Sequence, residues 1–338
     1  MSKLLTRRRY FRSLFLYLAF ALLVMGLAPF IGSESLDLSN VFSGAKGAWG
    51  FSHPDAIIFF DYRLPRVLLG FLVGGSLALV GSAFQVIFRN PLAAPSTLGV
   101  TAAGSVGAFV AFAVPSLTLA AGPFSTVPLF ALIGSALILT LIYLLARKSR
   151  GLSMYTLLLA GVTVGIFCSA LVLLIQYLSD PDRLFEMNRW TMGGLAVVGY
   201  QSLAAVLPLL LPGIGLLLMQ MPGLNHLALG EEMAAGYGID VARVQRYCFW
   251  GGGLATAAAV SVAGPIYFIG LIIPHITRRL SGFDNRLVLP ASFLAGGAFL
   301  VACDTAARTV VAPTEMPVGI ITATLGGPFF IYLLIKKR

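Results

Sequence analysis

Two ionisable residues stand four positions apart inside an apolar run, Asp304 and Arg308 in ACDTAAR, residues 302–308. Charge inside a membrane is costly, so such residues often serve a function in ion or substrate transport. On a helix the same spacing also permits an ordinary i,i+4 ion pair. The sequence alone leaves both interpretations open.

The stretch RLPR, residues 63–66, places two arginines at the start of another apolar run, with a proline that can begin a helix. Arginine binds carboxylates bidentately, so Arg63 and Arg66 could hold an acidic partner. Their long side chains could instead snorkel to the membrane surface and act as anchors. We expect Arg308 to lie near both if their helices pack together.

A polar, glycine-punctuated stretch, LGEEMAAGYGI, occupies residues 229–239. Glu231 and Glu232 suit the start of a helix, because its N-terminal end attracts negative charge. Gly236 and Gly238 suit its end. The stretch is therefore either a plain linker or a short helix held by a soluble partner.

The stretch RNPLAAPSTLGV, residues 89–100, interrupts a very apolar region. We expect Pro91 and Pro95 to end one helix and start the next, with Asn90 capping backbone groups at the turn.

Further along, His275 follows Pro274 and precedes two arginines, and we expect it to be a hydrogen-bonding loop residue. The other two histidines fall in different loops, so no metal site is predicted.

The motifs of common catalysts are missing from the sequence. There is no Gly-Lys dipeptide and hence no P-loop for a nucleotide, and no Ser/His/Asp or paired-carboxylate arrangement stands out. The three cysteines sit in apolar runs without a CxxC pair, which is typical of small core residues. We therefore expect a protein that is not an enzyme and binds no cofactor.

The composition indicates an integral membrane protein. Of the 338 residues 58% are hydrophobic and only 11% are charged, against about 25% charged in soluble domains. The net charge of +10 comes from basic residues in short loops, which sets membrane topology and does not indicate nucleic acid. We expect one membrane domain, residues 1–338, rather than several soluble ones.

Apolar runs of spanning length recur along the chain. The first has no clear cleavage site, so we expect a retained helix rather than a signal peptide. Pro115, Gly122 and Pro123 separate the third and fourth runs. The expected helices are all α-helical and cover about 13–31, 67–88, 96–114, 126–145, 152–178, 199–220, 247–263, 266–277, 288–308 and 316–335.

The distribution of basic residues distinguishes two topologies for residues 247–277: one membrane crossing, or a crossing followed by a return. With a return there are ten crossings, both termini are cytoplasmic, and 17 of the 23 lysines and arginines lie inside. A single crossing leaves them evenly divided. The inside set is Lys3, Arg7, Arg8, Arg9, Arg12, Arg89, Arg147, Lys148, Arg150, Arg243, Arg246, Arg278, Arg279, Arg286, Lys336, Lys337 and Arg338; the outside set is Lys46, Arg63, Arg66, Arg183, Arg189 and Arg308.

Five segments together resemble the FecCD-type permeases of bacterial ABC importers for iron–siderophore complexes, haem and vitamin B12. They occur in that family's order and spacing. The segments are RLPRVLLGFLVGGSLALVGSAFQVIFRNPLAAPSTLGV (63–100), LGEEMAAGYGI (229–239), GPIYFIGLIIPHITRRLSGFDNRLVLP (264–290), ACDTAAR (302–308) and EMPVGIITATLGGPFFIYLL (315–334).

The resemblance implies a type II importer fold in the bacterial inner membrane, with ten spans and two protomers, expected to be identical, around a central pathway. It implies two cytoplasmic ATPases, which bind ATP and Mg, and a periplasmic or lipoprotein binding protein. Arg63, Arg66 and Arg308 match arginines that dock the binding protein. The ATPase-coupling residues are Gly230, Glu231, Glu232, Ala234, Ala235, Gly236 and Gly238; the structural or translocation motif is Gln85, Asn90, Pro91, Pro274, His275 and Asp304.

A ferric siderophore is the first expected cargo because it is the commonest in that family, with haem and cobalamin open. The rival hypothesis is a secondary transporter driven by an ion gradient. Asp304 and ten spans would suit it, but it gives residues 229–239 no purpose, and it requires ion-coordinating groups near the midplane.

Overall fold

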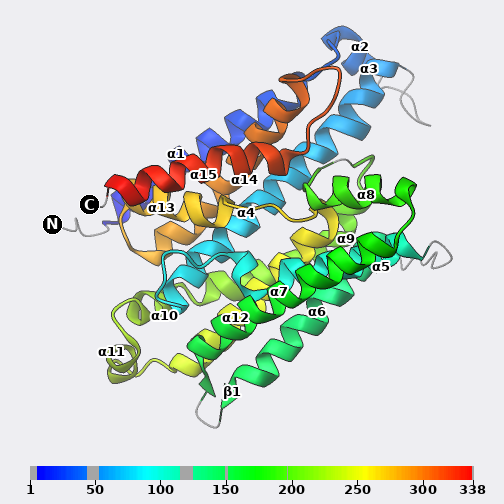
Figure 1. Cartoon of the computed structure of the whole chain (residues 1–338). Coiled ribbons are helices and arrows are strands. Elements are labelled where there is room, and N and C mark those ends of the chain that lie inside the picture. Colours follow the sequence, from blue (N-terminus) through cyan, green and yellow to red (C-terminus); the bar gives the residue numbers. More distant parts are fainter. Residues whose placement is uncertain (1–5, 44–52, 115–124, 149–150, 196, 337–338) are drawn as a thin grey trace.

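The computed structural model describes residues 6–43, 53–114, 125–148, 151–195 and 197–336. Helices dominate these residues, with one two-stranded ribbon, β1 (Arg147–Lys148) and β2 (Gly151–Leu152) (Figure 1). The α-helices are α1 (Arg7–Leu27), α2 (Leu38–Ser43), α3 (Pro54–Ile57), α4 (Leu64–Ile87), α5 (Val100–Ala113), α6 (Thr126–Ala146), α7 (Met154–Leu178), α8 (Pro181–Thr191), α9 (Gln201–Met219), α10 (Met221–Leu227), α11 (Glu231–Gly236), α12 (Val241–Ala263), α13 (Ile269–Ser281), α14 (Asn285–Thr309) and α15 (Val318–Lys336). Shorter turns are η1 (Ala28–Phe30), the π-helical η3 (Ile58–Arg63) and η4 (Pro95–Leu98).

Helix α4 lies at the centre of the bundle, and most of its side chains are buried. Its closest neighbour is α14, and small residues allow the two backbones to approach. A Cβ on Gly74 would lie 2.5 Å from the carbonyl oxygen of Gly296. The two helices therefore approach closely at Gly74, and dense packing of this kind holds membrane helices together.

The two ends of the bundle carry different elements (Figure 1). One end holds the start of α1, the end of α15, α10 and α11. A hydrogen bond of 2.8 Å between Tyr17 of α1 and Ser281 ties the end of α13 to the same region. The other end holds α2, α3 and α8. By the distribution of basic residues we refer to the first as the inner end and to the second as the outer end.

The segment 247–277 reverses direction, as the charge distribution predicts. Helix α12 ends at Ala263, and residues 264–268 turn the chain before α13 begins. Gly264 has φ +65° and Phe268 has φ +70°, a left-handed conformation that is rare for a bulky residue. Helix α13 then runs back toward the inner end (Figure 1).

Among the described residues, six helices are long and apolar enough to cross a membrane. They are Arg7–Phe30, Pro54–Ile87, Thr126–Ala146, Met154–Leu178, Gln201–Met219 and Asn285–Thr309. Apolar helices Val100–Ala113 and Val318–Tyr332 are shorter. The fold is an all-helical, multi-span membrane protein, while ten crossings stay a prediction.

Several predicted helix limits are wrong. The run 96–114 yields a helix of only 14 residues, α5, which at about 1.5 Å per residue falls short of a hydrocarbon core of about 30 Å. Helix α1 starts at Arg7 rather than near residue 13, because a helix can extend beyond its apolar part. The predictions on Lys3, Lys46, Pro115, Gly122, Pro123, Arg150, Lys337 and Arg338 lie outside the described residues.

The 89–100 stretch is a compact corner between α4 and α5. Asn90 accepts a hydrogen bond from the backbone N–H of Leu92 at 2.9 Å, which confirms its expected capping role. Pro95 does not start α5 as predicted: it begins the short turn η4, and α5 follows Gly99, whose φ is +68°. A Cβ on Gly270 of α13 would lie 2.5 Å from the Pro95 ring. Pro95, which interrupts the apolar pattern, therefore packs against α13.

Candidate functional site

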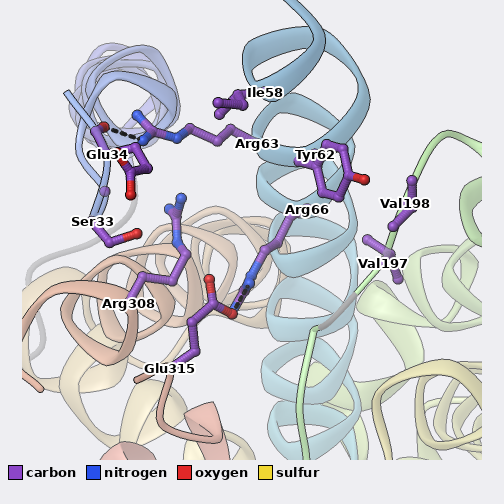
Figure 2. Close-up of a pocket in the computed structure, with 11 residues that line it drawn as sticks. Ser33, Glu34, Ile58, Tyr62, Arg63, Arg66, Val197, Val198, Arg308 and Glu315 are labelled. Atoms are coloured by element: carbon purple, nitrogen blue, oxygen red, sulfur yellow. Dashed lines mark hydrogen bonds and ion pairs between the residues drawn. The ribbon is translucent and has the colours of Figure 1, made fainter. Parts of the chain in front are cut away.

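A cavity of about 420 Å³ opens at the outer end, and arginines from two helices line it (Figure 2). Arg63 precedes α4, Arg66 lies in its first turn, and Arg308 lies in the last turn of α14. The expected proximity of the three is confirmed. We call this cavity the arginine pocket; its lining is Gly32, Ser33, Glu34, Ile58, Tyr62, Arg63, Arg66, Val197, Val198, Arg308 and Glu315.

Arg66 is the most heavily bonded of the three arginines. Its Nε lies 3.1 and 3.0 Å from the two carboxylate oxygens of Asp304, and its Nη2 lies 2.9 Å from Oδ1. Its Nη1 donates to Glu315 at 2.7 Å (Figure 2). Asp304 is 2% exposed, whereas the side chain of Glu315 is 43% exposed. One guanidinium thus joins a buried carboxylate to one that faces solvent.

Arg308 also faces Asp304, with Nε 3.2 Å from Oδ2, so the expected i,i+4 ion pair is confirmed. That Nε lacks hydrogen-bond geometry to any acceptor in the described chain. Its Nη2 donates to the carbonyl of Ala28 at 3.4 Å and to Thr305 at 3.3 Å. A single buried carboxylate therefore stands between two guanidinium groups, an arrangement that charge pairing makes tolerable in a buried place.

Arg63 is held by backbone oxygens. Its Nη1 donates to the carbonyl of Pro29 at 3.2 Å, and its Nη2 donates to the carbonyl of Glu34 (Figure 2). The residue is 6% exposed, and Arg66 is 9% exposed. The alternative that this pair snorkels as surface anchors is wrong, because both groups are bonded inside the protein.

The positive and negative charges of the pocket are balanced in number: three arginines face Glu34, Glu315 and Asp304. Glu315 is the most exposed member of the ionic contacts with Arg66, so it is the one that another carboxylate could replace. The geometry can therefore hold a carboxylate from outside without moving Asp304.

The rim of the pocket is fixed by the chain around residue 199. The backbone N–H of Gly199 donates to the Asp61 carbonyl at 2.7 Å, and the Tyr200 hydroxyl donates to the Phe60 carbonyl at 3.0 Å. Partial burial, and secondly the nearby Asp61 carboxylate, raise the pKa of the Tyr200 phenol. These contacts tie the chain at residues 199–200 to η3.

Glu315 and Glu34 are the charged pocket residues that sequence reasoning missed. Glu315 begins the quoted segment EMPVG and is the first acidic residue after Arg308, which was the available signal. The sequence gives no such signal for Glu34, because the position of Glu34 in the structure depends on how the chain after α1 folds back on α4.

At the inner end, residues 229–239 contain the predicted short helix. Helix α11 begins with Glu231 and Glu232 and ends at Gly236. Gly230 and Gly238 have φ of +122° and +78°, so they mark the two turns at its ends. We call residues 221–239, which include α10 and α11, the coupling segment, because they contain the stretch 229–239 that is expected to contact an ATPase.

The coupling segment exposes most of its predicted residues. Ala234 is fully buried, whereas Glu231, Glu232, Ala235 and Gly236 are exposed. Glu231 Oε1 accepts a hydrogen bond from Gln245 of α12 at 2.9 Å, which fixes α11 to that helix. The exposed side of α11 is therefore open to a soluble partner.

The residues of the predicted translocation motif are not brought together in one site. Gln85 Nε2 lies 3.4 Å from the carbonyl of Gly270, which links α4 to α13. Pro274 is buried inside α13, and His275 is also on this helix, half-buried, rather than in the expected loop. Asn90 and Pro91 lie in the corner after α4, and Asp304 is paired with Arg66 and Arg308, which line the arginine pocket.

Metal chemistry finds no support within the described ranges, where no group of three His, Cys, Asp or Glu side chains is arranged to hold an ion. Cys168, Cys248 and Cys303 are buried, as expected of core residues. The candidate sites are thus one binding pocket at the outer end and one exposed segment at the inner end.

Comparison with known proteins gives consistent matches over nearly the full chain. The FecCD transport family matches residues 18–336. The hemin transport system permease of Yersinia pestis is 38% identical over 336 residues, covering 96% of this chain and 95% of the relative. The vitamin B12 import system permease of Klebsiella pneumoniae is 39% identical over 292 residues, covering 86% of each.

A solved structure has the same fold. It is an inward-facing conformation of a metal-chelate type ABC transporter, 30% identical, with a TM-score of 0.81. The match covers 97% of this chain and 99% of the solved chain.

Proposed function

Because this chain belongs to the FecCD transport family, as the match over residues 18–336 shows, we propose that it imports an iron chelate across the cytoplasmic membrane. It is a multi-pass permease of an ABC importer and is not itself catalytic. ATP and Mg belong to partner ATPases, and the chain carries no cofactor. The observation that carries the proposal is the near full-length similarity to a hemin permease.

The proposed partners are four: a second copy of this chain, a pair of ATPases, and a substrate-binding protein at the outer face. The arginine pocket supports the last of these, since a partner carboxylate can reach Arg66 where Glu315 now sits. The exposed acidic start of α11 supports contact with the ATPases. No nucleic acid is involved.

The proposed mechanism uses the two ends of the bundle in turn. The loaded binding protein docks on Arg63, Arg66 and Arg308. ATP binding closes the ATPases, which displace the coupling segment and shift the helices between outward- and inward-facing arrangements. The chelate passes between the two protomers.

The cargo is the finer part of the proposal. We propose an iron chelate, a ferric siderophore or haem, as the substrate. The hemin relative favours an iron-bearing cargo, and so does an iron(3+)-hydroxamate permease of Bacillus subtilis, 35% identical over 288 residues. Cobalamin is the competing cargo, because vitamin B12 permeases match with similar identity.

Uptake into liposomes tests both function and cargo. The permease would be reconstituted with its ATPase and binding protein, and labelled ferric siderophore, haem and cobalamin would be supplied separately. We expect ATP-dependent uptake of one iron-bearing cargo, and loss of that uptake with Arg63→Gln. Uptake of cobalamin alone would overturn the cargo. Uptake that ignores ATP and follows an ion gradient would overturn the importer and favour a secondary transporter.

A further inference from the structure

The side-chain amide of Asn225, on α10, joins the coupling segment to α14. Its Nδ2 donates to Asp284 Oδ1 at 2.7 Å, and its Oδ1 accepts from the backbone N–H of Asn285 at 2.7 Å. Asp284 is also the N-cap of α14, accepting from the backbone N–H of Arg286 at 2.9 Å. Both ends of one amide are thus bonded to the first residues of a central helix.

The start of α14 is bonded in turn to α13 and α4. Asn285 is fully buried, and its Oδ1 accepts from Arg278 Nη1 at 3.3 Å. Arg278 Nη2 donates to the carbonyl of Ser82 in α4 at 3.0 Å. Deeper in the bundle, the Ser292 hydroxyl lies 2.8 Å from the hydroxyls of both Ser82 and Thr277. Three helices are therefore cross-linked just beneath Asn225.

Helices α4 and α14 run on from this junction to the arginine pocket. Their backbones interlock at Gly74 and Gly296, so they cannot slide past each other without a clash. At the outer end the same two helices are joined by Arg66 and Asp304. The pair is therefore held together along its length and at its outer end.

The junction also has an unfilled bond. The Nδ2 of Asn285 is buried and has no hydrogen-bond partner among the described residues. A buried donor without an acceptor costs stability, so this junction is held by its other bonds.

We propose that Asn225 is a positioning residue that fastens the coupling segment to the α4–α14 pair, so that movement of the segment reaches the arginine pocket. The inference rests on the proposed function and deepens it. Asn225 acts through Asp284 and the backbone of Asn285.

The test uses the whole complex in liposomes, with Asn225→Ala in the permease. We expect the ATPase still to co-purify, which would show that the variant folds and assembles. Stimulation of ATP hydrolysis by the loaded binding protein, and ATP-driven uptake, should both fall roughly tenfold, the usual size of coupling between distant sites. Asn188→Ala, on the exposed helix α8 at the outer end, is the matched control and should change none of these readouts.

A charge swap keeps the test informative. Asn225→Asp sets a second carboxylate against Asp284 and should uncouple the complex. Adding Asp284→Asn removes the facing negative charge: the amide now at position 284 can donate to the carboxylate introduced at position 225, and that carboxylate still accepts from the Asn285 N–H. Because one oxygen of Asp284 makes both parental bonds, to Asn225 and to the Arg286 N–H, this donation gives up the cap on Arg286. We expect the double variant to regain at least half of the parental uptake.

The remaining outcomes distinguish a failure of the proposed function from a failure of the role proposed for Asn225. If the parental complex shows no ATP-driven uptake, the proposed function fails. If the parent transports and Asn225→Ala transports and responds equally well, the positioning role is overturned. It is also overturned if Asn225→Ala fails to retain the ATPase, or if the swapped pair regains no coupling, because Asn225 would then serve assembly or folding.

Discussion

Arg66 of α4 holds both carboxylate oxygens of Asp304 on α14, a residue 238 positions later in the chain. This contact joins the outer ends of the two most closely packed helices. It also places the carboxylate between two arginines, since Arg308 approaches from one helical turn further on. The relationship makes Asp304 a structural centre of the arginine pocket.

We expect Asp304→Asn to destabilise the protein strongly. It leaves two buried guanidinium groups without their shared carboxylate, and breaking a buried ion pair costs about 3–5 kcal/mol. The control is Asp240→Asn, which loses only an exposed pair with Arg243, worth less than about 1 kcal/mol. Thermal unfolding in detergent compares the two, and equal unfolding temperatures would show that Asp304 does not hold the helices together.

Glu315→Gln should strengthen binding of the substrate-binding protein. Glu315 occupies Arg66 Nη1 in the free permease, so its neutralisation removes a competitor for an incoming carboxylate. We expect the dissociation constant to fall roughly threefold or more at low salt, with a smaller effect at high salt.

The control for that prediction is Asp182→Asn, which removes one exposed negative charge on α8 at the same end. Equilibrium binding to the permease in nanodiscs gives the comparison. Weaker binding by Glu315→Gln would mean that Glu315 itself contacts the partner. An equal gain in affinity in both variants would mean that the loss of one negative charge, and not its position, causes the effect.

Gly74→Ala should loosen the α4–α14 pair. The added methyl group would lie 2.5 Å from both the Gly296 carbonyl oxygen and the Cβ of Leu300. Overpacking of this kind costs about 1–3 kcal/mol. Gly26→Ala in α1 is the matched control, since nothing lies within 4 Å of its added Cβ and alanine favours a helix over glycine. Unfolding temperatures that move together would contradict the close packing.

Glu232→Arg should weaken attachment of the ATPase by roughly tenfold. Glu232 is exposed in the first turn of α11. A positive charge there repels groups that the carboxylate attracts, and it is unfavourable at the N-terminal end of a helix. Glu186→Arg makes the same charge change on α8 at the outer end. Pull-down of the ATPase at graded salt would separate them, and retention by both variants would exclude α11 as the contact.

Patterns within single segments could be predicted from the sequence. Composition indicated the membrane class, and the acids and glycines of residues 229–239 predicted a short helix with the right start and end. The distribution of basic residues predicted the reversal after α12, because it reports on a whole loop rather than on one contact. The same local reasoning was wrong for α5, where Pro95 begins a separate turn that packs on Gly270.

The sequence by itself determined which residues carry charge in an apolar chain, and their spacing along each helix. The i,i+4 pair of Asp304 and Arg308 follows from spacing alone, because a helix repeats every 3.6 residues. Only the tertiary structure decided that Arg66 shares Asp304, that Glu315 completes the contact, and that Asn225 bonds to the start of α14. Those partners lie on different elements, and their meeting depends on how glycine-lined surfaces pack, which no local pattern encodes.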